Sequence, residues 1–398
     1  MNVRTIESVP LRLTRDIDVI VVGEVWMAKS QLKKLNQVQK KLGLPEFANP
    51  RNVAAGSIRQ LDSKIAMSRK LDTFIYDLEM TSEKFPERQS QELEYLKGLG
   101  FKVNSNWKHC KNVNEVVGFW KDWERKRDSL DYQLDGVVVK LDERNLQEKV
   151  GYTGKAPRWG IAFKFAPEQV TTVVDDIQLQ IGRTGVLTPV AHLRPVLVAG
   201  STVSRATLHN EDEIRRLDVR IGDTVILQKA GDVIPDIVSV LKEMRTGKEK
   251  PYEFPEFVPE CGGDGRIERI PGQAAWRCVA KDSFIQHKRK LYHFVSKIAF
   301  DIDRVGPKVI DALLENQLIS NSADIFTLKK GDLLQLPRFG EKSVDNILTS
   351  IEKAREVTLG RFIISLSIPH VGEETAYLLA DHFGSIENIK SAKRGDNH

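Results

Sequence analysis

Two short apolar runs each carry a single lysine, and these lysines are the residues that point most clearly to a chemical role. The runs Asp135-Gly-Val-Val-Val-Lys140 and Ala162-Phe-Lys164-Phe165 consist of β-branched or aromatic residues, which predicts strands. A lysine there must keep its charge at the rim of an apolar sheet. Two such lysines on neighbouring strands would converge on one anion, and phosphate is the anion that such pairs usually bind. The alternative is a pair of edge-strand lysines that point into solvent.

An acidic residue and two arginines upstream could complete a nucleotide site. Glu24 lies near the end of an apolar run, where it is either a surface charge or a ligand for a ribose hydroxyl or a metal ion. Arg51 and Arg59 lie in a segment of small residues, 47–62, which lets the backbone approach a ligand, and arginine offers forked donors to phosphate. A helix start with two solvated arginines explains each feature alone but not easily all of them together.

The elements that must position these residues change in type along the chain. Up to residue 168 the pattern predicts strands at 17–26 and 71–78 alternating with amphipathic helices at 29–43, 89–99 and 113–126. From 170 to 245 short alternating strands and turns follow, among them Gly182-Arg183-Thr-Gly185. Strands at this spacing predict a small Greek-key barrel of the OB type, a frequent nucleic-acid platform.

The last hundred residues repeat one unit three times. Turns at Gly306, Gly340 and Gly372 each precede an apolar-periodic helix, and these glycines lie 34 and 32 residues apart. Paired helices with backbone N–H groups at the second helix start form a sequence-neutral phosphate clamp, the helix-hairpin-helix pattern. One copy could simply cap a helix, whereas three in register favour the clamp. In each copy arginine or histidine replaces the earlier glycine of the turn, which predicts a looser clamp.

The bulk properties exclude few classes of protein. The 398 residues have room for two to four domains, and a net charge of +5 does not identify a partner. A nucleic-acid binder of this composition needs its positive charge arranged on one face. No apolar run approaches the ~18 residues of a membrane span. The three cysteines, Cys110, Cys261 and Cys278, predict no disulfide framework and suit a reducing cytoplasm.

Taken together, the motifs resemble the motif series of bacterial NAD-dependent DNA ligases in order and spacing. The resemblance implies a multidomain α+β protein: part of an ATP-grasp-like nucleotidyltransferase (adenylation) domain at 1–168, an OB-fold β-barrel at 169–246, a small degenerate zinc-finger segment at 247–288, and an all-α helix-hairpin-helix domain, truncated, at 289–398. It further implies NAD and Mg²⁺ as cofactors, nicked double-stranded DNA as partner, and a monomer in the cytoplasm, associated with the nucleoid and not with a membrane.

The resemblance also implies roles for individual residues. Glu24 would contact the adenosine ribose, and Lys140 and Lys164 would hold the adenylate phosphate. The DNA or the nucleotide side of the site would be contacted by the following residues: Arg51, Arg59, Arg127, Arg183, Gly306, Gly340 and Gly372. One departure lies next to Glu24, because the family usually has arginine where this chain has Val22.

Residues 258–286 correspond to the family's four-cysteine zinc finger, but only two cysteines remain. Cys261 and Cys278 occupy ligand positions, whereas Val258 and Ser283 stand at the other two, and Val258 cannot bind a metal. His287 and His293 are nearby but do not fall on the ligand spacing. We therefore expect packing in place of zinc.

The family's nucleophile, the lysine of a Lys-x-Asp-Gly motif, is missing from these residues. The nearest match is Gln133-Leu-Asp-Gly136, and glutamine cannot form the phosphoramide. We expect that the nucleophile and the nicotinamide-gripping domain precede Met1, so that the chain is incomplete at both ends. Two other hypotheses remain: a catalytically inactive protein that binds nicked or duplex DNA, and an unrelated repair factor with helix-hairpin-helix repeats. The latter would need clustered carboxylates, which the sequence does not show.

Overall fold

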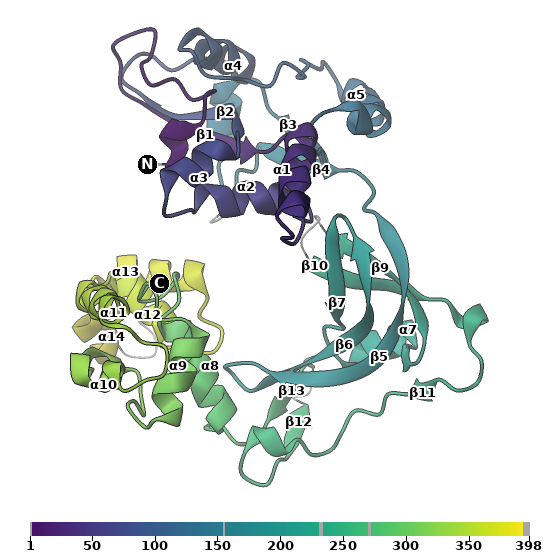
Figure 1. Ribbon diagram of the computed structural model, residues 1–398, viewed down its shortest axis with the longest axis vertical. Helices are drawn as coiled ribbons and strands as arrows, with labels where there is room; N and C mark the ends of the chain where they lie inside the picture. Colours follow the sequence, from purple (N-terminus) through teal and green to yellow (C-terminus); the bar gives the residue numbers. More distant parts are fainter. Residues whose placement is uncertain (1, 154–155, 231–233, 270–271, 393–398) are drawn as a thin grey trace. The chain divides into compact units, whose positions relative to one another are not determined.

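The computed structural model describes residues 2–153, 156–230, 234–269 and 272–392 (Figure 1). The chain forms two compact units. The first comprises Met1–Val170 together with Pro195–Val203 and Leu227–Pro235, and the second comprises the rest.

Two antiparallel strands begin the first unit. β1 (Val19–Trp26) pairs with β2 (Asp72–Thr81), and their register shifts immediately before Gly23. A Cβ at Gly23 would lie 2.4 Å from the Ile75 Cδ1 atom, so only glycine fits this close approach of the two strands. The sheet buries one face under α4 (Gln89–Gly98), where Leu96 is fully buried beside Leu78.

A second pair of strands carries the two lysine-bearing runs. β3 (Gly136–Lys140) pairs antiparallel with β4 (Gly160–Lys164), which confirms the predicted strands. α5 (Val113–Lys126) packs against this pair through Trp120, whose ring stacks on Phe163 with centroids 4.7 Å apart and whose Nε1 donates to the Phe163 carbonyl oxygen at 3.1 Å.

The first unit also has a small core of Ile6, Met27, Val53, Ala54 and Leu71, against which α1 (Lys29–Lys41) and α2 (Pro50–Ile58) pack. Its remaining described helices are η1 (Asn2–Thr5), α3 (Ser63–Ser68), η2 (Arg127–Ser129) and α6 (Arg144–Val150). Two features stabilise the start of α2: the Asn49 side chain accepts a hydrogen bond from the Asn52 N–H, and a proline occupies the first helical position.

Five strands between residues 169 and 240 close into the predicted barrel. They run in the order β6-β5-β9-β10-β7, and β7 also pairs with β6, which leaves no free edge among the five. Their bounds are β5 (Gln169–Ile181), β6 (Val186–Val198), β7 (Ser201–Thr207), β9 (Thr224–Ala230) and β10 (Ile234–Val240), with α7 (Glu211–Leu217) and β8 (Arg220–Ile221) inserted.

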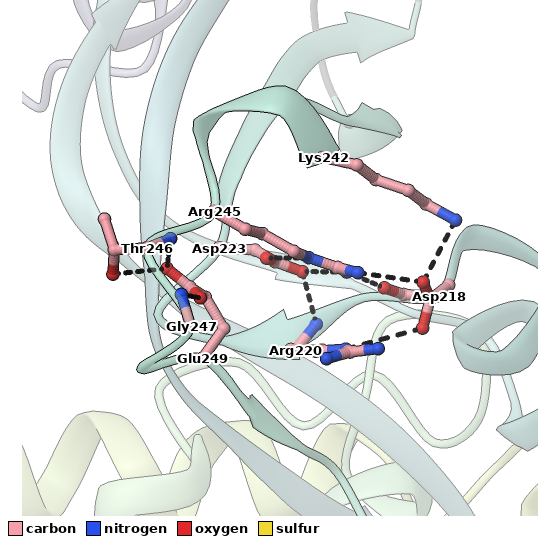
Figure 2. A network of polar contacts seen from close by, with 8 residues as sticks. All are labelled: Asp218, Arg220, Asp223, Lys242, Arg245, Thr246, Gly247 and Glu249. Atoms are coloured by element: carbon pink, nitrogen blue, oxygen red, sulfur yellow. Dashed lines mark hydrogen bonds and ion pairs between the residues drawn. The ribbon is translucent and has the colours of Figure 1, made fainter.

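An ion cluster holds the segment after β10 onto the barrel (Figure 2). The Asp223 side chain is fully buried and accepts from the Arg245 guanidinium at 2.8 and 2.9 Å and from the Arg220 backbone N–H at 2.7 Å. Arg245 and Lys242 both lie 3.0 Å from an Asp218 carboxylate oxygen. Hydrogen bonds from Lys242, which has the larger effect, and from Arg245 lower the pKa of Asp218 to about 2.

The segment that resembles a zinc finger extends the barrel sheet instead of forming a separate metal-bound module. Its strands β12 (Ile267–Arg269) and β13 (Trp276–Cys278) pair with each other, and β13 pairs with β6. Within the segment, β11 (Lys250–Pro251) and η4 (Pro259–Cys261) come before these strands, and η3 (Lys242–Met244) precedes the segment. The Trp276 Nε1 donates to Glu211 of α7 at 2.7 Å, which fastens the segment to the barrel.

The prediction that the cysteines form no disulfide is wrong for Cys261 and Cys278. These two residues are joined by a disulfide, with Cα atoms 5.2 Å apart, and they lie 17 positions apart in sequence. Sequence spacing alone could not reveal this, because the hairpin of β12 and β13 is what brings the two former ligand positions together. Cys110 is a free cysteine.

Seven α-helices, α8 to α14, follow in the described part of the C-terminal region, green to yellow in Figure 1. Apolar residues every three or four positions give most of these helices a buried face. Helices α8 to α11 share a core that includes Ile310, Leu333 and Val344, and α12 and α13 meet in a second cluster with Ile363 and Ala376. With one 3₁₀ turn they are α8 (Phe284–Phe294), α9 (Pro307–Glu315), η5 (Ala323–Thr327), α10 (Lys330–Leu334), α11 (Glu341–Lys353), α12 (Leu359–Ser365), α13 (Glu373–Phe383) and α14 (Ile386–Ser391). This confirms the all-α helix-hairpin-helix domain.

Candidate nucleotide and DNA-binding site

Lys140 lies at the end of β3 in a partly enclosed polar and aromatic setting. Its Nζ atom donates to the Asp77 Oδ1 atom at 3.0 Å and lies 3.4 Å from the Tyr76 carbonyl oxygen. The rings of Tyr76 and Trp159 both lie 5.6 Å from Nζ, within the range of a cation–π contact. Only 20% of the Lys140 side chain is exposed, so the alternative of a lysine pointing freely into solvent does not hold here.

Glu24 reaches the same site from β1. It is exposed and pairs in register with Phe74 of β2. Burial raises the pKa of the Tyr76 hydroxyl, and the charges of Glu24 and Asp77 raise it further, which places both carboxylates around that ring. Glu24, Tyr76, Asp77 and Lys140 therefore line one patch formed by β1, β2 and β3.

Sequence reasoning missed Tyr76 and Asp77, the closest partners of Lys140. The available signal was Asp77 itself, a charged residue between the apolar runs of a predicted strand, which usually needs a partner. The partner could not be named from the sequence, because Asp77 and Lys140 lie 63 positions apart.

Lys164 lies at the opposite end of the same pair of strands, β3 and β4. Its Nζ atom donates to the Asp135 Oδ2 atom at 2.6 Å, and half of its side chain is exposed. The register pairs Gly136 with Lys164 and Gly160 with Lys140, so both lysines are on one face but four residues apart, or roughly 13 Å along the strands. The structure therefore gives each lysine its own carboxylate, and only a ligand that lies along this face could contact both.

The three arginines of the first unit occupy different positions. Arg51 in the first turn of α2 and Arg59 at its C-cap are both exposed. Eight residues correspond to about 80° around a helix, so both arginines belong to the same side of α2. The Arg127 guanidinium lies 5.4 Å from the centre of the Phe165 ring, next to Lys164 in sequence.

Arg183 lies in the turn between β5 and β6. Gly185 of this turn has φ +81°, a conformation in which glycine is favoured. Arg183 is exposed, and its guanidinium lies 3.1 Å from the Nδ1 atom of His293 in α8.

The three repeated glycines are the N-caps of the helices that follow them. Gly306 precedes α9, Gly340 precedes α11 and Gly372 precedes α13, and none of them provides a side-chain cap. A shallow cavity of about 570 Å³ next to the first of these turns is lined by Lys297, Arg304 and Lys308 among others.

The residue two positions before each glycine has a left-handed backbone. The φ angles are +67° for Arg304, +73° for Arg338 and +66° for His370. A side chain in this region costs roughly 1–2 kcal/mol relative to glycine. The turn geometry is thus kept in all three copies although its usual glycine is replaced, and each copy presents a basic side chain there.

The donors of the zinc-finger segment do not suit zinc. Both sulfur atoms are bonded to each other, Val258 is buried in an apolar cluster with Cys261, Cys278, Ile181 and Leu187, and the Ser283 hydroxyl accepts from the Gln286 N–H as the N-cap of α8. In the parts of the chain that the structure describes, no three His, Cys, Asp or Glu side chains are grouped to hold a metal. No described helix is long and apolar enough to cross a membrane.

The OB-type barrel and the helix-hairpin-helix domain are folds typical of proteins that bind nucleic acid, and comparison with known families identifies the family. The model of the NAD-dependent DNA ligase adenylation domain matches residues 1–168, and that of the NAD-dependent DNA ligase OB-fold domain matches 171–249. A SAM-like helix-hairpin-helix tandem matches 298–353, and a helix-hairpin-helix motif matches 361–396.

Curated relatives agree with these matches over nearly the whole chain. The DNA ligase of Halalkalibacterium halodurans is 47% identical over 391 residues, that of Bacillus subtilis 46% over 393, and that of Halothermothrix orenii 49% over 392. The alignments cover 98%, 99% and 98% of this chain but 58% of each relative, so the chain spans less than two thirds of their length. The chain belongs to the NAD-dependent DNA ligase family.

Proposed function

We propose that this chain takes part in sealing nicks in duplex DNA by adenylate chemistry, in DNA replication and repair. The observation that carries the proposal is the patch of Glu24, Tyr76, Asp77 and Lys140, with Lys164 on the same face of the β3–β4 hairpin. A ribose hydroxyl could donate to Glu24 while the phosphate of an adenylate replaces the carboxylates that now neutralise the lysines.

The last step of sealing makes specific demands on this patch. The 3′ hydroxyl oxygen of the nick attacks the 5′ phosphorus and its proton passes to solvent. The new phosphodiester bond forms, and the bond to the adenylate breaks so that AMP leaves with the extra negative charge. Lys140 and Lys164 would stabilise that charge, because fixed cations in a partly dry site stabilise developing charge well. Mg²⁺, held chiefly by the phosphates, would neutralise further charge, and NAD supplies the adenylyl group in this family.

The DNA contacts in this proposal are sequence-neutral. Arg51, Arg59 and Arg127 would contact the nucleotide and the nick phosphates, and Arg183 would contact the duplex. The N–H groups that follow Gly306, Gly340 and Gly372 would each bind a backbone phosphate. Contacts of this kind suit a monomer that acts in the cytoplasm on nucleoid DNA.

The decisive experiment supplies a nick whose 5′ phosphate is already adenylated. With Mg²⁺ we expect the 398-residue polypeptide to convert this nick into a continuous strand, measured on a denaturing gel. Binding of the nick without any sealing would instead support the second candidate, a DNA-binding protein without catalysis. That candidate is favoured by one observation, the lack of a Lys-x-Asp-Gly motif in these 398 residues.

A second outcome concerns the first step of the reaction. Incubation of this polypeptide with NAD should leave its mass unchanged in intact-protein mass spectrometry, because these 398 residues contain no Lys-x-Asp-Gly motif. A mass increase of one adenylyl group, mapped to any lysine, would show that another side chain serves as nucleophile.

The former zinc-finger segment offers a further prediction. We expect a metal chelator to leave the thermal unfolding unchanged, whereas reduction of the Cys261–Cys278 disulfide should lower the free energy of unfolding by about 3 kcal/mol, as for a loop of this length. Differential scanning calorimetry with and without dithiothreitol measures this. The control is the Cys261→Ala/Cys278→Ala variant, which should not respond to dithiothreitol; destabilisation of the unmodified chain by the chelator would contradict the prediction.

A further inference from the structure

The turn that carries Arg183 is held by helix α8. A Cβ at Gly185 would lie 3.3 Å from the Gln286 Nε2 atom, so the turn packs directly on that side chain. Gln286 is 2% exposed, and its Nε2 donates to the Ala280 carbonyl oxygen at 2.7 Å. The Cys278 N–H donates to the Gly185 carbonyl oxygen at 2.9 Å. The backbone on the C-terminal side of Arg183 is therefore held against its neighbours.

His293, two turns further along α8, connects this turn to α12. It is 8% exposed, and its Nε2 lies 2.9 Å from the Ile364 carbonyl oxygen. Because a carbonyl oxygen only accepts, Nε2 must carry the hydrogen. In the neutral ring Nδ1 then has a free lone pair, and the Arg183 NH1 group donates to it at 3.1 Å. The two contacts together select one tautomer of the imidazole.

We propose that His293 is a positioning residue for Arg183: its neutral imidazole connects Ile364 of α12 to the Arg183 guanidinium and directs the remaining N–H groups of that guanidinium toward a DNA phosphate. This inference rests on the proposed function, in which Arg183 contacts the duplex. Holding a long, exposed side chain before the DNA arrives lowers the entropy lost on binding. No sequence pattern indicates this role, since His293 lies 110 positions from Arg183.

The electrostatic surroundings keep the imidazole neutral. Burial lowers the pKa of His293, the Ile364 carbonyl raises it, and the positive charge of Arg183 lowers it again. Most of the other charged groups on the packed elements are cations: Arg289 and Lys290 lie one turn back on α8, and Arg361 of α12 binds the carbonyl oxygens of residues 297 and 299. Asp301 pairs with that last arginine at 3.7 Å.

Protonation would remove the contact between His293 and Arg183. With hydrogens on both nitrogens, the imidazolium would turn a donor toward the guanidinium and place two positive charges together. The contact is therefore fully present above the ordinary histidine pKa of 6.5 and is lost as the pH falls through the lower pKa of the folded protein.

The test uses the full 398-residue chain and a fluorescent nicked duplex, with the dissociation constant measured by anisotropy over a salt series at pH 7.5. Arg183→Gln should weaken binding and reduce the slope of log K against log salt by about 0.9, the loss of one phosphate contact. His293→Phe keeps the ring volume but removes both hydrogen bonds, and should weaken binding roughly 2- to 10-fold. His293→Gln keeps a donor and an acceptor and should recover much of that loss.

A matched control lies on the same helix. The His287 Nε2 atom is buried without a hydrogen-bond partner, so His287→Phe changes a histidine of α8 that bonds neither Arg183 nor Ile364 through that atom. We expect its dissociation constant to stay within 2-fold of that of the unmodified chain. Circular dichroism and thermal unfolding of every variant show whether each remains folded.

The outcomes separate the inference from the proposed function. If His293 acts through Arg183, then His293→Phe has no further effect in the Arg183→Gln background. An equal loss in both backgrounds would overturn the inference, and so would an unchanged dissociation constant for His293→Phe when Arg183→Gln binds more weakly. An unchanged dissociation constant for Arg183→Gln would overturn the DNA contact assigned to Arg183 and with it the inference.

A pH series gives a readout that a purely structural role would not change. Between pH 7.5 and 5 the unmodified chain should lose the roughly 2- to 10-fold affinity that the positioning of Arg183 contributes, whereas His293→Gln, which does not titrate, should not show this loss. Parallel pH profiles for the two proteins would overturn the inference.

Discussion

Replacing Lys140 by methionine should slow the sealing of a pre-adenylated nick by about 10²–10³-fold, the usual effect of removing one group that stabilises developing charge. Methionine keeps most of the apolar stem between the rings of Tyr76 and Trp159, so the change removes mainly the ammonium group. We expect the rate constant of strand closure to fall while the dissociation constant for nicked DNA changes little. Single-turnover kinetics with a labelled adenylated strand measure both quantities.

Two controls make this prediction specific. Lys140→Met also leaves the Asp77 carboxylate without its cation, so Lys140→Met/Asp77→Asn should be as slow as the single variant but more stable. Lys149→Ala changes an exposed lysine on α6, outside the patch, and should seal at the unmodified rate. Equal rates for Lys140→Met and Lys149→Ala would contradict the role of Lys140.

Arg245→Met should lower the free energy of unfolding of the barrel by about 3–5 kcal/mol, because it leaves the fully buried Asp223 carboxylate without its ion pair. The lost partner is a guanidinium that is only 16% exposed and also donates to the Asp218 backbone oxygen (Figure 2). Urea unfolding followed by tryptophan fluorescence should show the change as an earlier transition. A midpoint equal to that of the unmodified chain would contradict the structure of this cluster.

The chain offers a matched control on its own surface. Arg215 pairs with Glu211 at 2.6 Å, but its side chain is 72% exposed, so Arg215→Met should cost no more than about 1 kcal/mol. Arg245→Met/Asp223→Leu removes both buried charges and should recover part of the lost stability, since the unpaired carboxylate causes most of the destabilisation.

The same cluster predicts a modest pH dependence. The pKa of Asp218 is lowered to about 2 from its ordinary 3.8, so its contribution is complete above 3.8 and is lost as the pH falls through about 2. Asp218 is 41% exposed, and solvent screening limits this contribution to that of a surface pair, at most about 1 kcal/mol. Arg245→Met should therefore flatten the decline in stability between pH 4 and 2.

The sequence by itself determined the succession of elements and the family. Local patterns were sufficient for this: β-branched runs such as Gly136–Lys140 form strands, and the glycine turns before α9, α11 and α13 begin helices as expected. The motifs resembling ligases lie within elements whose propensities agree with the fold, so their order could be recognised without coordinates.

Contacts between distant residues were decided only by the tertiary structure. The partner of Lys140 is Asp77 because the fold brings the end of β3 within reach of β2, and the partner of Cys261 is Cys278 because the β12–β13 hairpin returns there. The separation of Lys140 and Lys164 follows from an antiparallel register that spacing does not reveal. A sequence pattern reports what each segment prefers, whereas ion pairs, disulfides and tautomers depend on which segments meet in space.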